Sequence, residues 1–152
     1  MPYSTVDARQ RLLDALAVAA DQLGLAVASL TEAYEQLDEN TADRLERDLF
    51  RPVQSAYGRA QRTHTQFATR HDLPPRRFAA PAAGAPARGV KGLIERAVQE
   101  VEEADRELAD LQDSMLPVEV GDAELRADLE KIRTLLDHTR THARELVRTF
   151  GR

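Results

Sequence analysis

The sequence contains no cysteine. This absence excludes disulfides, zinc sites with thiolate ligands, iron–sulfur clusters and cysteine nucleophiles. None of the four serines lies in a Gly-x-Ser-x-Gly turn, and neither His-Glu-x-x-His nor Glu-x-x-His occurs. The one run that resembles a phosphate loop, residues 84–91, lacks a lysine directly after its second glycine. We therefore expect no enzymatic activity and no cofactor.

Long uninterrupted apolar runs are also missing. The most apolar stretch, Ala15 to Leu30, is broken by Asp21 and Gln22. It is shorter than the roughly 20 residues that a bilayer core requires, and its acidic residues are atypical of a signal peptide. We expect a cytoplasmic protein with no membrane partner. The net charge of −5 argues against nucleic acid as a partner.

Apolar residues recur at alternating spacings of three and four, the period of helices that pack along one seam. In the first segment the seam has no missed step: Leu13, Leu16, Ala20, Leu23, Val27, Leu30, Tyr34 and Leu37. A parallel row widens this face with mostly small side chains and lets another helix approach closely: Leu12, Ala19, Ala26 and Ala33. The pattern predicts an all-α domain over residues 1–152. Its four helices lie at about residues 5–38, 41–72, 90–115 and 122–150.

Two breaks in the pattern divide the first half of the chain. The apolar residues that follow residue 40 are one position out of phase with the first seam, which predicts a tight turn and a helical hairpin. The step from Leu49 to Val53 is four where three is due, and it contains Pro52. Because proline removes a backbone hydrogen bond, we expect a kink there.

The connection between the second and third helices decides the topology. Residues 73–89 form a Pro/Ala-rich linker that could span about 50 Å at ~3.1 Å per residue. The third helix could therefore start at either end of the bundle. The net charge alternates along the chain, at −5 for residues 1–40, +4 for 41–87, −5 for 88–121 and +1 for 122–152. Alternation favours an antiparallel up-down-up-down four-helix bundle over a ferritin-like crossover, which would place two acidic helices side by side.

Three sets of residues are candidate sites. His138 and His142 lie one helical turn apart, and parallel second and fourth helices would bring His64 to their level, which suggests a metal site. The alternative, which we favour, is that these histidines lie at the edge of the core with one side in water.

The second candidate is an anion-binding site at the linker and the start of the third helix, formed by Arg76, Arg77, Arg88 and Lys91. A linker that only keeps the chain soluble is the preferred interpretation. Arg126, Arg133 and Arg140, on one edge of the fourth helix, are predicted to pair with an acidic helix. Phe78 is the expected anchor of the linker.

The third candidate is an apolar connection that either closes the end of the bundle or docks a partner: Met115, Leu116, Pro117, Val118 and Val120. The preferred function is a non-enzymatic interaction or scaffold module that binds a protein partner. Self-association as a homodimer through the first helix is expected, because Val18 and Leu25 lie off its seam. The alternative is a ligand- or metal-binding bundle that uses the histidines.

Overall fold

A computed structural model describes residues 5–79 and 89–150 of the chain. This part of the chain is helical apart from short turns and an extended segment after residue 70, and it contains no strand. The all-α prediction is confirmed. The helices are α1 (Thr5–Glu35), α2 (Glu39–Leu45), the π-helical turn η1 (Glu46–Phe50), α3 (Arg51–Arg70), α4 (Gly89–Asp113), α5 (Leu116–Val120) and α6 (Ala123–Phe150).

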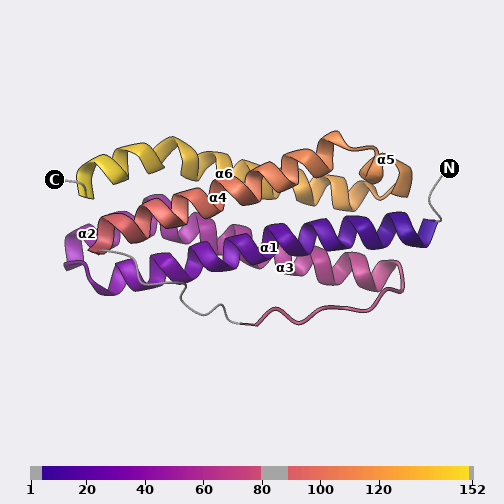
Figure 1. Cartoon of the computed structure of the whole chain (residues 1–152), viewed down its shortest axis with the longest axis horizontal. Coiled ribbons are helices and arrows are strands. Elements are labelled where there is room, and N and C mark those ends of the chain that lie inside the picture. Colours follow the sequence, from indigo (N-terminus) through magenta and orange to yellow (C-terminus); the bar gives the residue numbers. More distant parts are fainter. Residues whose placement is uncertain (1–4, 80–88, 151–152) are drawn as a thin grey trace.

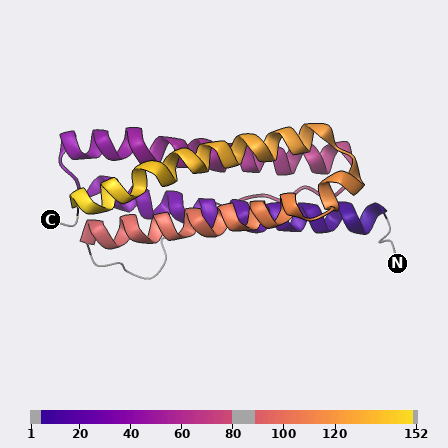
Figure 2. The same ribbon diagram turned by 90° about the horizontal axis from the view of Figure 1, so that it is seen from above.

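The long helices lie side by side in an elongated bundle (Figure 1). Helix α1 packs most extensively against α4 and also against α3, while α6 packs against α3 and α4. Helices α3 and α4 run in the same direction, and α1 and α6 run in the opposite one, as both views show (Figures 1 and 2). Every extensive contact is therefore between antiparallel helices.

The expected up-down-up-down order is wrong. It requires the second and third long helices to be antiparallel neighbours, whereas α3 and α4 are parallel and each packs against α1 and α6. The size of the side chains on α1, and not the alternation of net charge between helices, accounts for which helices are neighbours. Ala19, Ala26 and Ala33 are fully buried, and Ser29 on the same side of α1 hydrogen-bonds to Glu100 of α4. Small side chains there allow the two acidic helices to pack closely.

The first turn lies at residues 36–38, where the phase break near residue 40 predicts one. Asp38 caps α2, because its carboxylate accepts a hydrogen bond from the Thr41 N–H at 2.9 Å. That hydrogen bond lowers the pKa of Asp38.

The phase slip at Pro52 takes the form of a π-helical turn, η1, in which the Arg51 N–H donates to the carbonyl of Glu46. Pro52 has no N–H to offer the carbonyl four residues earlier, and the wider turn absorbs one extra residue. Val53, Ala56 and Ala60 are thereby brought back into the core, where all three are fully buried.

Helix α1 is long and apolar enough to cross a membrane by length and composition, and 56% of its most apolar window is buried against the rest of the protein. Contacts with α3 on one side and α4 on another explain why so much of this helix is apolar.

After α3 the chain turns back along the bundle. Asp72 has a φ of 55°, and the Leu73 N–H donates to the carbonyl of Ala68 at 2.8 Å, which closes the end of the helix. The segment 73–79 then runs beside α1 and α3 (Figure 1). Leu73 and Phe78 are its half-buried anchors on the core, as the sequence predicts for Phe78. Residues 80–88 of the expected linker lie outside the described residues.

Candidate functional site

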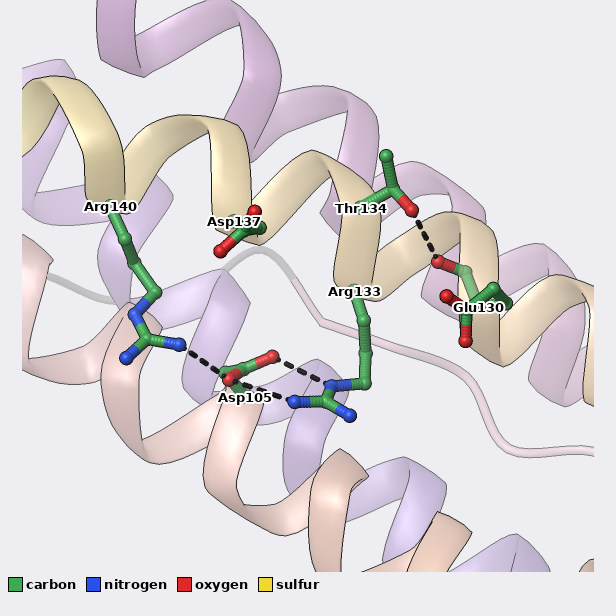
Figure 3. A pocket seen from close by; sticks show the side chains of 6 residues that line it. All are labelled: Asp105, Glu130, Arg133, Thr134, Asp137 and Arg140. Atoms are coloured by element: carbon green, nitrogen blue, oxygen red, sulfur yellow. Dashed lines mark hydrogen bonds and ion pairs between the residues drawn. The ribbon is translucent and has the colours of Figure 1, made fainter.

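A charged cluster joins α4 to α6. Asp105 is only 7% exposed. It accepts hydrogen bonds from Arg133 Nε at 3.0 Å and from Arg140 Nη1 at 2.9 Å (Figure 3). Arg133 also donates to Gln112 at 2.7 Å, and its hydrogen bond to Asp105 raises the pKa of its guanidinium. The expectation that arginines on this edge pair with an acidic helix is confirmed for Arg133 and Arg140.

Beside this cluster lies an open hollow of about 250 Å³, lined by Asp105, Glu130, Arg133, Thr134, Asp137 and Arg140 (Figure 3). Both carboxylate oxygens of Asp105 accept hydrogen bonds from the arginines, so this residue is poorly placed to act as a base. The arrangement clamps α4 to α6.

A second polar centre lies where the segment 73–79 crosses α3. His64 is 2% exposed, and its ring meets that of Phe78 edge-on, with centroids 5.2 Å apart and planes at 90°. Within the described part of the chain Nδ1 of His64 has no hydrogen-bond partner. Burial and the nearby Arg76 lower the pKa of His64, against smaller opposing effects of Asp14 and Asp21.

Arg76 holds this crossing together. Its guanidinium lies over the Phe78 ring, 5.0 Å from the centroid, and its Nη2 pairs with Asp21 of α1 at 2.9 Å. Two members of the predicted anion site thus have acidic partners, since Lys91 also lies 3.8 Å from Glu95. Arg77 is exposed, and Arg88 lies outside the described residues. Within residues 5–79 and 89–150 the structure shows no anion site formed by this set, and the site stays a prediction.

The predicted three-histidine site is also not brought together. Its geometry required parallel second and fourth helices, whereas α3 and α6 are antiparallel. Arg70, at the end of α3, pairs with Asp122 and Glu124 at the start of α6. His64 and His142 are therefore on the order of 20 Å apart along the bundle, at 1.5 Å per residue. Among residues 5–79 and 89–150 no group of three or more His, Asp or Glu side chains could hold a metal ion.

His138 and His142 do lie together on α6. Their ring centroids are 4.7 Å apart, with planes at 63°. His138 is exposed and His142 is half-buried. The helical spacing predicts that these two rings lie close together, as observed, whereas His64 lies elsewhere along the bundle.

Sequence reasoning missed a cluster at the end of α3. Asp122 Oδ2 accepts hydrogen bonds from Arg70 Nη2 at 2.9 Å and lies 2.8 Å from His71 Nε2, while Oδ1 accepts from the Leu125 N–H at 2.8 Å. Burial opposes the charge of Asp122, but these hydrogen bonds together lower its pKa. The capping role of Asp122 is readable from the sequence. Its partners are not, because they depend on which end of α3 meets α6.

A second carboxylate lies between the two acidic helices. Glu100 of α4 is half-buried, its Oε2 has no hydrogen-bond partner in the described residues, and Ser29 of α1 hydrogen-bonds to the carboxylate. Burial raises the pKa of Glu100 to about 7, and Glu103 adds to the rise, while Arg96 and Ser29 oppose it. The ionised form of Glu100 therefore lowers the stability of the folded state at neutral pH.

The apolar connection before α6 has a buried part and an exposed part. It forms the short helix α5, in which Pro117 is buried and Leu116 and Val120 pack against the core. Met115 and Val118 are 61% and 56% exposed. Closure of the bundle therefore uses three of the five residues, and two remain at the surface.

Comparison with protein families, with curated proteins and with solved structures found no match to this chain.

Proposed function

We propose that this protein is a non-enzymatic interaction module, a four-helix bundle with a crossover connection, that pairs with a second copy of itself through α1. The observation that carries the proposal is the exposure of two large apolar side chains on the outer side of α1. Val18 is 47% exposed and Leu25 is 38% exposed. They lie seven residues apart, so they share one side of the helix.

The row of small side chains on α1 does not take part in this pairing. Ala19, Ala26 and Ala33 are fully buried inside the bundle. Val18 and Leu25 instead lie on a side of α1 that also carries Asp14 and Asp21, at spacings of three and four residues. The proposed surface is thus narrow and has an apolar centre with a polar rim.

The positions of these residues suit a two-fold, antiparallel pairing of α1 helices. In a two-fold interface, when one residue of the first copy contacts a second residue of the other copy, the reverse contact also forms. The midpoint between Val18 and Leu25 falls at Asp21 and Gln22, so an axis there would place Val18 of one copy against Leu25 of the other. Asp21 would meet its own copy near the axis, and its ion pair with Arg76 offsets that repulsion.

The test combines light scattering with a cysteine placed on the proposed axis. We expect the wild-type protein to have the mass of a dimer at high concentration, and Leu25→Glu to have that of a monomer. Val118→Glu is the matched control, because it changes a valine on α5 that is 56% exposed, more than Leu25, and should leave the dimer intact. A wild-type monomer at all concentrations contradicts the proposal.

The lack of native cysteine permits a second measurement. Gln22→Cys should form an intermolecular disulfide much faster than Gln66→Cys, which lies on the exposed side of α3. Equal rates for the two variants count against the pairing of α1 helices.

A further inference from the structure

The two histidines of α6 form a pair whose chemistry the proposed pairing of α1 helices does not use. His138 and His142 project from neighbouring turns, beside the buried seam residues Thr139 and Ala143. Within the described chain neither imidazole has a hydrogen-bond or ion-pair partner. Their ring nitrogens are therefore available to a ligand from solution.

The spacing of the rings fits chelation of one metal ion. With a metal–nitrogen distance of about 2.0–2.1 Å, a bound imidazole has its centroid about 3.2 Å from the metal. When the nitrogen–metal–nitrogen angle lies between its octahedral and tetrahedral values, the centroids of two such rings are about 4.5–5.2 Å apart. The observed 4.7 Å lies within that range. Small side-chain rotations would then suffice to direct one nitrogen of each ring at a shared ion.

We propose that His138 and His142 form a two-histidine chelate for one divalent ion of the copper, nickel or zinc class. Imidazole nitrogen suits these ions, whereas magnesium and calcium require oxygen ligands. Since no third protein ligand is placed beside the pair in the described residues, water fills the remaining coordination positions. Both ligands belong to one rigid helix, so binding needs no rearrangement of the bundle.

The site is independent of the surface proposed for self-association. The pair lies on α6, whereas Val18 and Leu25 lie on α1, and α1 and α6 occupy opposite corners of the bundle. The two proposals can therefore fail separately. A monomer that binds nickel would contradict only the self-association, and a dimer that does not bind nickel would contradict only the metal site.

The experiment is calorimetric titration of the untagged protein with Ni²⁺ and, separately, Zn²⁺. We expect one ion per chain, with binding weakened at least tenfold in His138→Ala and in His142→Ala. His71→Ala, which changes a histidine at the far end of α3, should bind as the wild type does. Circular dichroism of each variant checks that it is folded.

A variant with relocated histidine provides the matched control. His142→Ala combined with Glu145→His keeps four histidines but places the α6 pair two turns apart, about 10 Å along the helix axis. It should bind as weakly as His142→Ala alone. Wild-type affinity in this variant, or in His138→Ala, would overturn the proposal, as would the absence of binding by the wild-type protein.

Discussion

The ring of Phe78 meets the buried ring of His64 edge-on, with centroids 5.2 Å apart, although the two residues are separated by the end of α3 and a chain reversal. The guanidinium of Arg76 stacks on the Phe78 ring and forms an ion pair with Asp21 of α1. The extended segment 73–79 is thus held to both α1 and α3 by specific side chains.

Phe78→Ala should lower the free energy of unfolding by about 1–2 kcal/mol, because it removes an aromatic pair and half-buried apolar surface. Chemical denaturation measures this change. The same variant should be cut faster by trypsin after Arg76 and Arg77, since the segment loses its anchor. Phe78→Leu is the control, because it keeps an apolar cover over His64, and it should resemble the wild type in both measurements.

Loss of stability on acidification should depend on His64. Its folded-state pKa is lowered by burial and by Arg76, so below the ordinary imidazole value of about 6.5 the unfolded chain binds more protons than the folded protein. The stability that depends on neutral His64 is fully present above that pH and is lost as the pH falls from there through the lower folded-state pKa. Urea midpoints at pH 7.5 and 5.5 should differ less in His64→Gln than in the wild type. An unchanged difference would show that His64 does not contribute.

Glu100 should have the opposite dependence on pH. Its pKa is about 7 in the folded protein, above the unfolded value, so the folded state holds the proton more tightly and stability falls as the pH rises from about 4.5 to 7. Glu100→Gln should stabilise the protein at pH 8 by about 1 kcal/mol after allowance for solvent screening, and by much less at pH 4.5. Glu102→Gln, at an exposed position of the same helix, is the control and should have little effect at either pH.

The helices were predictable because their signals are local. The seam of α1, the cap at Asp38 and the phase slip at Pro52 are each visible within a few residues of sequence. The slip was expected to be a kink, and the structure resolves it into a π-helical turn. This outcome follows from the same two facts, one missing N–H and one extra residue.

The order of the helices was not predictable from charge. Individual surface ion pairs contribute little to the free energy of unfolding. Close packing of α4 on the small side chains of α1 contributes more. One surface pair, Arg76 with Asp21, forms between the linker and α1, which the alternation of whole-helix charges cannot anticipate. The expected order also placed His64 level with His142, because it made α3 and α6 parallel. The proximity of His138 and His142 does not depend on that order, because both residues belong to one helix.

Removal of Asp105 tests the clamp between α4 and α6. Asp105→Ala should lower the free energy of unfolding by about 1–2 kcal/mol, since it leaves Arg133 and Arg140 without their carboxylate while both can still reach water. Asp105→Asn keeps the shape and removes the charge, so it should cost less. Arg133→Ala should lower the free energy of unfolding more than Arg140→Ala, because the Arg133 side chain is 33% exposed and that of Arg140 is 47% exposed.

A double-mutant cycle measured by urea denaturation tests the ion pair directly. Asp105→Ala and Arg133→Ala should be coupled, so that the double variant loses less free energy of unfolding than the sum of the two single losses. Strict additivity would mean that the ion pair drawn in Figure 3 contributes nothing to stability.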